Sequence, residues 1–94
     1  MAKEYEHSNM TDDLDHCYLC GRERVQFHHV LGKYDRKKCT EDGLFIPVCL
    51  ECHIKIHNER SQQLNHKLKQ EAQWIYEQTH DHGEWVKRYG RNYL

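Results

Sequence analysis

Two pairs of cysteines have the spacing of a metal site. Two residues separate Cys17 from Cys20 and Cys49 from Cys52, and 28 residues lie between the pairs. Because this short spacing lets both thiolates of a pair reach one tetrahedral ion at ~2.3 Å, the double motif predicts a structural zinc held by all four cysteines. The alternatives are two disulfides in a secreted domain, or four buried cysteines without an ion. Both are disfavoured, because residues 1–16 hold no apolar run of a signal peptide and the motif occurs twice in a polar chain.

Four of the nine histidines form a second set of donors. His28 and His29 are neighbours in a predicted strand, whose successive side chains face opposite sides, so one of them can bind a metal while the other faces a substrate. His53 and His57 lie four apart in a predicted helix and can grip one ion from a single face. The pattern predicts three nitrogen ligands with open coordination positions, as catalysis requires. The alternatives are solvated or core histidines, and a second, closed zinc site without catalysis.

The composition explains why such a chain needs a metal. Its 94 residues are 37% apolar with a mean hydropathy of -1.07, so the core alone stabilises the fold little. No segment approaches the ~20 apolar residues of a membrane span, and we expect a cytoplasmic protein without a membrane partner. The fifth cysteine, Cys39, lies in a polar, basic segment and is interpreted as an unliganded thiol.

The charges are unevenly distributed along the chain. The net charge is -1, but residues 1–16 hold five acidic residues against one lysine, and the remainder holds 13 basic and 10 acidic residues. We interpret residues 1–16 as a flexible acidic tail. The mildly basic body contains a cluster that is a candidate for contacts with a nucleic-acid backbone, although a solvated loop is the alternative. Its members are Lys33, Arg36, Lys37 and Lys38.

The elements expected between the motifs form a strand–strand–helix unit. Strands are predicted over 25–31 and 44–48, where Pro47 favours an edge or a strand end, and residues 32–42 are predicted to be a polar loop. A helix over about 50–59 opens at the second cysteine pair and carries the two spaced histidines. The unit is assigned to residues 17–60.

Residues 61–94 are predicted to be a helical extension that packs on this unit. Ser61 can cap a helix that runs to about residue 79. Its apolar stripe has helical spacing and consists of Leu64, Leu68, Ala72 and Ile75. Gly83 allows a break between this helix and a short last helix, which is predicted from Trp85, Val86 and Tyr89. The fold class is therefore α+β: a small zinc-stabilised ββα core with added C-terminal helices.

Residues 17–57, with the run CYLCG…HHV…GLFIPVCLECHIKIH, resemble the HNH, or ββα-metal, endonucleases, whose core is treble-clef-like. The spacing of the histidines is similar to that of colicin-type DNases. The surrounding sequence is more similar to small phage and prophage proteins of this class, including the recombination-enhancement nucleases. The resemblance implies that His28, His53 and His57 bind the catalytic metal and that His29 is the general base. It also implies a structural zinc on the four cysteines. The Asn that usually precedes the second strand is missing, and Asp42 is a candidate substitute.

The function expected from this resemblance is metal-dependent hydrolysis of DNA phosphodiester bonds with low sequence specificity, in phage or prophage DNA processing or recombination. The catalytic ion would be Zn²⁺, Ni²⁺, Mn²⁺ or Mg²⁺, acting as a Lewis acid beside the base. The expected partners are DNA and a host or phage recombination or replication protein. The alternative is a zinc-stabilised module that binds nucleic acid or a host protein and has weak or no nuclease activity.

Overall fold

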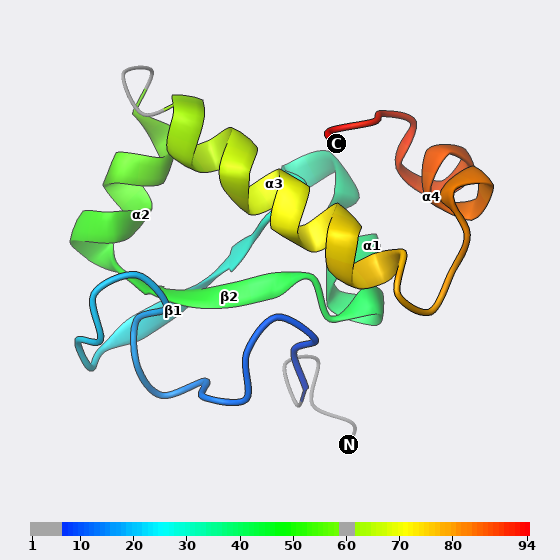
Figure 1. Cartoon of the computed structure of the whole chain (residues 1–94). Helices are drawn as coiled ribbons and strands as arrows, with labels where there is room; N and C mark the ends of the chain where they lie inside the picture. The colour runs from blue at the N-terminus through cyan, green and yellow to red at the C-terminus, as the bar shows by residue number, and fades with distance from the viewer. Residues whose placement is uncertain (1–6, 59–61) are drawn as a thin grey trace.

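The computed structural model describes residues 7–58 and 62–94. Two antiparallel strands, β1 (Val25–His29) and β2 (Phe45–Cys49), form a sheet in which His28 lies opposite Ile46. Helix α2 (Leu50–His57) follows β2 directly. Helix α3 (Gln62–Tyr76) then crosses the sheet, as Figure 1 shows. The ββα order predicted for residues 17–60 is therefore present.

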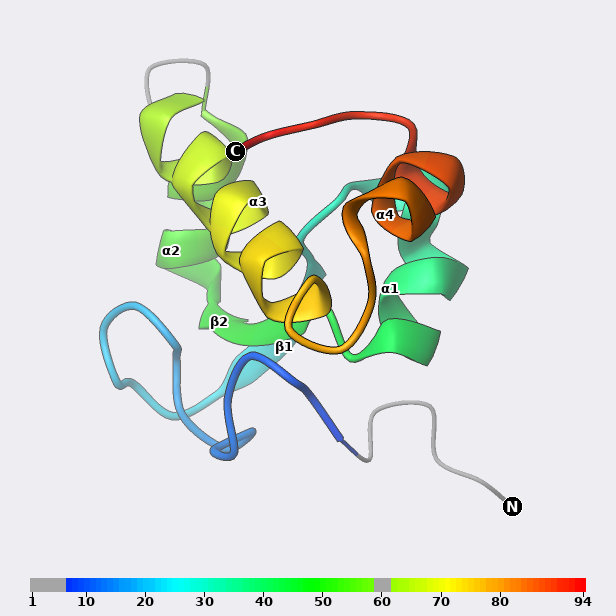
Figure 2. The same cartoon turned by 45° about the vertical axis from the view of Figure 1, so that its right-hand side comes forward.

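Strand β2 is the centre of the core, because all five of its residues are buried. Helix α3 lies along one side of the sheet, and the chain that precedes β1 passes along the other (Figures 1 and 2). That preceding chain is attached by hydrogen bonds. The Ser8 hydroxyl donates to the Phe45 carbonyl at 2.6 Å, and the Tyr18 N–H donates to the Pro47 carbonyl at 2.7 Å. Ser8 and Met10 are themselves buried. The prediction of a loosely attached tail is thus wrong for residues 8–10; residues 1–6 lie outside the described part.

The segment predicted to be a polar loop is largely helical. It contains a short 3-10 helix, η1 (Lys33–Asp35), and helix α1 (Arg36–Asp42). The helix forms because Cys39 is fully buried and anchors it to the core. Gly43 ends the helix with a φ of 68°, in the left-handed region that favours glycine. A Cβ there would lie 2.8 Å from the Asn9 nitrogen, so residue 43 must also be small.

The C-terminal helices join the same core. Leu68 and Ala72 of the predicted stripe are buried, with Leu64 and Ile75 packed beside them. Helix α4 (His82–Tyr89) buries Trp85 completely. Gly83 lies inside α4, so the predicted break is wrong; Asp81 starts the helix by accepting a hydrogen bond from the Glu84 N–H at 2.7 Å. The cap predicted at Ser61 lies outside the described residues. No described helix is both long and apolar enough to cross a bilayer.

Candidate metal centres

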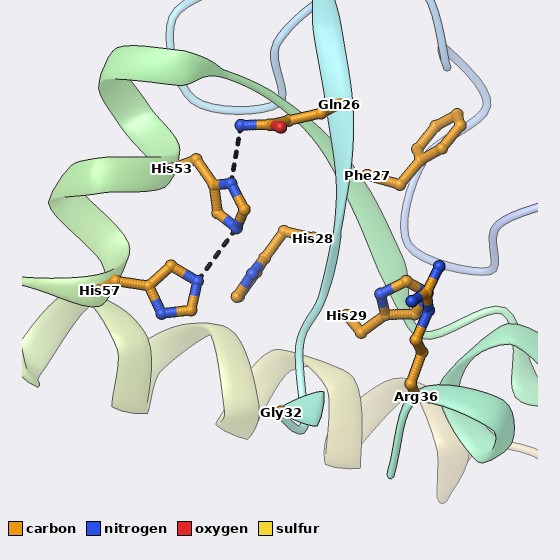
Figure 3. Close-up of a pocket in the computed structure, with 8 residues that line it drawn as sticks. All are labelled: Gln26, Phe27, His28, His29, Gly32, Arg36, His53 and His57. Carbon is orange, nitrogen blue, oxygen red and sulfur yellow. Dashed lines mark hydrogen bonds between the residues drawn. The ribbon is translucent and has the colours of Figure 1, made fainter. Parts of the chain in front are cut away.

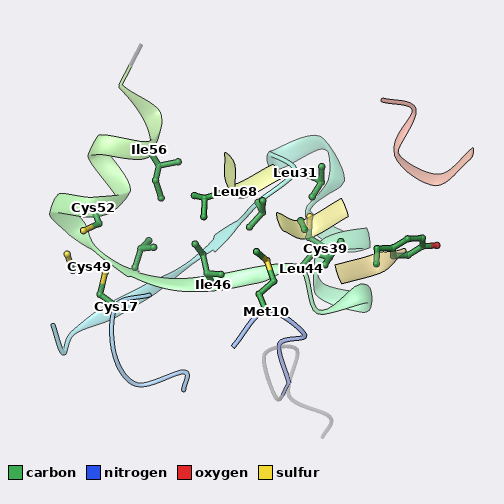
Figure 4. Close-up of a cluster of buried hydrophobic side chains, with 14 of the residues drawn as sticks. Met10, Cys17, Leu31, Cys39, Leu44, Ile46, Cys49, Cys52, Ile56 and Leu68 are labelled. Atoms are coloured by element: carbon green, nitrogen blue, oxygen red, sulfur yellow. The ribbon is translucent and has the colours of Figure 1, made fainter. Parts of the chain in front are cut away.

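The four paired cysteines converge from three parts of the chain. Cys17 and Cys20 lie in the turn before β1, Cys49 ends β2, and Cys52 lies in the first turn of α2. Figure 4 shows Cys17, Cys49 and Cys52 beside one another. Their sulfur atoms all lie within 4.8 Å of one another, and the Sγ atoms of Cys20 and Cys49 are 3.6 Å apart. A tetrahedral zinc with bonds of ~2.3 Å places its sulfurs ~3.8 Å apart. The four cysteines could therefore hold one metal ion.

The surroundings of Cys17 favour its thiolate form. The Gly21 N–H donates to the Cys17 carbonyl at 2.9 Å and closes the turn. Burial tends to raise the pKa of Cys17, but hydrogen bonds from the backbone of Cys49, Cys20 and Leu19 outweigh it and lower this pKa to about 6. Burial and the neighbouring thiols raise the pKa of Cys52 to about 12. The negative charge of the Cys17 thiolate, which forms first, therefore disfavours deprotonation of Cys52. A bound cation would compensate that charge and lower the pKa of Cys52.

A second group of donors joins β1 to α2. His28 comes from the strand, and His53 and His57 come from successive turns of the helix (Figure 3). Their ligand nitrogens lie within 4.8 Å of one another, and the Nε2 atoms of His53 and His57 are 3.0 Å apart. Two ligands at right angles on an ion at ~2.1 Å would be ~3.0 Å apart. These three histidines could therefore hold a second metal ion.

His28 is the most constrained member of this group. Its side chain is 5% exposed, and its buried Nε2 has no hydrogen-bond partner. Burial, followed by the nearby His53 and His57, lowers the pKa of His28 to about 3, so the ring is neutral near pH 7. A neutral, buried and unpaired ring nitrogen is costly unless something binds it. A divalent cation between the three rings would supply that partner.

Gln26 supports the second group from outside. It lies two residues before His28 on β1 and therefore on the same face of the strand. The Nε2 of its amide donates to the Nδ1 of His53 at 2.8 Å, so the proton of a neutral His53 ring lies on Nε2, 3.0 Å from the Nε2 of His57. If an ion were bound through the Nε2 of His53, that proton would move to Nδ1, and the amide oxygen of Gln26 would be the group that accepts it. Such outer partners orient metal-binding histidines. The two-residue spacing was the signal in the sequence that could have indicated Gln26.

His29 lies on the other side of β1, next to Arg36 (Figure 3). A cavity of about 500 Å³ nevertheless spans both sides of the strand; it is lined by Gln26, Phe27, His28, His29, Gly32, Arg36, His53 and His57. The Nε2 of His29 is 3.2 Å from the Thr40 hydroxyl. Nothing in the sequence indicated Thr40, because its segment was predicted to be a loop.

Asp42, the candidate substitute for the missing Asn, binds other groups. Its Oδ2 accepts a hydrogen bond from the Arg88 Nε at 2.6 Å and another from the Tyr89 hydroxyl. Burial, followed by the hydrogen bond to Asp42, raises the pKa of Tyr89 well above its usual range. Asp42 therefore ties α1 to α4, and the prediction that it braces the base finds no contact to support it.

The four basic residues of the predicted backbone-binding cluster differ in their surroundings. Arg36 lines the cavity and Lys37 is exposed. The Nζ of Lys38 donates to the Arg88 carbonyl at 2.7 Å and lies 3.7 Å from Asp35, so Lys38 is bound within the protein. The side chain of Lys33 lies outside the described part. Among the described side chains of the cluster, Arg36 is the one brought to the histidines.

Comparisons with known proteins give one partial similarity. No family model matches the chain, and no solved structure matches it. A similar curated protein is the mitochondrial DNA mismatch repair protein mutS homolog of Sarcophyton glaucum, which is 30% identical over 71 residues. The match covers 67% of this chain but 7% of that protein, so this chain corresponds to a small part of it.

Proposed function

We propose that this protein is a metal-dependent endonuclease of the HNH type that hydrolyses DNA phosphodiester bonds. One observation carries the proposal: three histidines able to hold an ion share a cavity with a fourth histidine and an arginine. The unpaired, buried Nε2 of His28 supports an ion rather than a packing role for this group. Three protein ligands leave coordination positions for substrate and water, as in catalytic sites.

Each side chain of the cavity then has a chemical role. A divalent ion on His28, His53 and His57 would supply Lewis-acid stabilisation of the charge on the phosphate and the leaving oxygen. His29 takes a proton from a water molecule as the water oxygen bonds to phosphorus. The bond from phosphorus to the 3′-oxygen breaks, and a second water returns a proton to that oxygen. Arg36, whose guanidinium is always charged, binds a non-bridging phosphate oxygen.

The four-cysteine group has a separate role in this proposal. All four ligand positions of a tetrahedral ion would be filled by Cys17, Cys20, Cys49 and Cys52, as in structural zinc sites. Because Cys52 precedes His53 directly, a zinc there fixes the first turn of the helix that presents two of the catalytic ligands. We assign zinc to this site because thiolate ligands and tetrahedral geometry select it.

DNA is the proposed substrate for two reasons. The sequence resembles DNA-cleaving enzymes, and the partly similar protein of Sarcophyton glaucum is named as a DNA mismatch repair protein. The cavity offers groups for a phosphate, and contacts to phosphates carry no direct sequence information, so we expect weak sequence preference. Phage DNA processing or recombination in the host cytoplasm, beside a recombination or replication protein, is the setting that the resemblance favours.

A binding module with little nuclease activity is the second candidate. Two observations favour it: Asp42 is bound to Arg88 instead of replacing the missing Asn, and Lys38 is bound within the protein. The overall charge of -1 also weakens attraction to DNA. In this case the three histidines would hold an ion that stabilises the fold.

Nicking of supercoiled plasmid distinguishes the two. The parent should nick DNA with Mn²⁺, Ni²⁺ or Mg²⁺, and His29→Ala should reduce the rate ~10²–10⁴-fold while the ion still binds. His53→Ala should lose both the second ion and the activity, whereas His66→Ala, on the exposed part of α3, should resemble the parent. No cutting by the parent with any of these ions would favour the binding module. Loss of the ion in His29→Ala would show that its role is assigned wrongly.

A further inference from the structure

The hydroxyl of Thr40 contacts His29 from the neighbouring helix. Thr40 is the fifth residue of α1, and its Oγ1 lies 3.2 Å from the Nε2 of His29. The same hydroxyl donates a hydrogen bond to the Arg36 carbonyl at 3.0 Å. A carbonyl oxygen can only accept, so the single hydroxyl proton of Thr40 is committed to Arg36. The hydroxyl can then only accept from His29, which must carry its proton on Nε2.

The hydrogen bond from His29 to Thr40 determines which ring nitrogen of His29 can accept a proton. A neutral imidazole has one protonated and one unprotonated nitrogen, and the hydrogen bond made by one nitrogen sets the state of the other. With the proton on Nε2, the lone pair that can accept a proton lies on Nδ1. We propose that Thr40 is a positioning residue, which holds His29 in the Nε2-protonated form and makes Nδ1 the atom that takes the proton of the attacking water. The second half of this proposal rests on the proposed nuclease function; the first half does not.

The surroundings of α1 explain why Thr40 can fix a ring. Two contacts to α4 flank it: Lys38 donates to the Arg88 carbonyl, and Asp42 accepts from the Arg88 side chain. Cys39, next to Thr40, is fully buried. The helix is therefore held on both sides of the residue that contacts His29. In this view α4 supports the site from a distance, since it anchors the helix that carries Thr40.

The missing Asn gives this contact its importance. The residues before β2 are Glu41, Asp42, Gly43 and Leu44, and Asp42 is hydrogen-bonded to Arg88 of α4. Thr40 contacts the proposed base from α1, directly before these residues. Serine at position 40 would keep the hydroxyl, and valine would keep the shape without it. These two substitutions separate the hydrogen bond from the packing.

The protonated nitrogen of His29 can be measured without any activity. We would record ¹⁵N NMR spectra of the zinc-loaded full chain at pH ~8, which is ~1.5 units above the ordinary histidine pKa of ~6.5. The ring signals of His29 are the ones that disappear in His29→Gln. The parent and Thr40→Ser should show Nε2–H, and Thr40→Val should show a mixture of both forms. A parent that carries the proton on Nδ1, or a Thr40→Val protein with an unchanged ring, would overturn the proposal. If Thr40→Val does not fold, the position of the proton in the parent spectrum is the test of the proposal.

Nicking assays then test the catalytic half. Thr40→Val should lower kcat at least ~10-fold with little change in KM, and Thr40→Ser should restore it. An unchanged kcat in Thr40→Val, together with a mixed ring, would remove the catalytic role and leave the tautomer assignment intact. A parent that never cuts DNA would reject the nuclease function, while the NMR result would still accept or reject the contact.

Discussion

Replacement of His28 by phenylalanine should stabilise the protein when no ion occupies the histidine site. The ring of His28 is buried with Nε2 unpaired, and an unsatisfied buried polar group costs ~1–3 kcal/mol. Phenylalanine keeps a flat ring and removes that cost, and the adjoining cavity of about 500 Å³ can take its extra volume. We therefore expect His28→Phe to unfold with a free energy ~1–3 kcal/mol above that of the parent.

Addition of an ion should reverse this order. A ligand that binds the folded parent adds ~2.7 kcal/mol at 100 times its Kd, whereas the variant has lost a ligand and should gain little. Urea unfolding of protein loaded with one equivalent of zinc, with and without Ni²⁺, measures both effects. The fluorescence of Trp85, which is fully buried, is a suitable signal. His66→Phe, at an exposed position, is the control and should follow the parent.

Two results would refute this reasoning. If His28→Phe is less stable than the parent without Ni²⁺, then the Nε2 of His28 has a favourable partner in the folded protein and is not available as a metal ligand. If both proteins gain equally from Ni²⁺, the ion binds elsewhere, and the three histidines are not its site.

Three further predictions concern the zinc, the core and the alkaline range. Cys52→Ser, or strong chelation, should unfold the chain, because structural zinc contributes on the order of 10 kcal/mol; a chelated chain with an intact circular dichroism spectrum would contradict this. Leu68→Ala should cost ~2–5 kcal/mol in urea unfolding, since Leu68 is 2% exposed, whereas Leu50→Ala, at 65% exposure, should cost under ~1 kcal/mol; equal costs would show that α3 is not docked. Burial and Asp42 raise the pKa of Tyr89, so the stability it contributes is complete below pH ~10 and falls by ~1.4 kcal/mol per pH unit above it. Tyr89→Phe should flatten that decline in alkaline urea titrations, and an unchanged slope would assign it to other groups.

The parts of the site that depend on local spacing could be predicted from the sequence. Two residues between cysteines, and three between helical histidines, fix which donors share a turn or a face. The structure brings both predicted donor groups together. The apolar stripe of α3 likewise follows from helical periodicity, and its residues Leu68 and Ala72 are buried.

The parts that depend on distant partners could not be predicted. Helix α1 has no apolar periodicity; one buried residue, Cys39, and the contacts of Lys38 and Asp42 with Arg88 hold it. The segment around Ser8 is polar, but its hydroxyl hydrogen bonds to carbonyls 35 and 37 residues away attach it to the sheet. Composition alone indicates neither contact, so Thr40 was missed together with the helix that carries it.

The direct succession of Cys52 and His53 restricts how this chain can change in length. One inserted residue between them would leave every donor in place in the sequence but rotate the two histidines by ~100° relative to the cysteines. One helix could then no longer present its donors to both candidate metal centres. Insertions should therefore be tolerated in the connection of residues 77–81, between α3 and α4, and excluded from the junction of β2 with α2. Length variation at that junction would thus be as damaging as loss of a ligand.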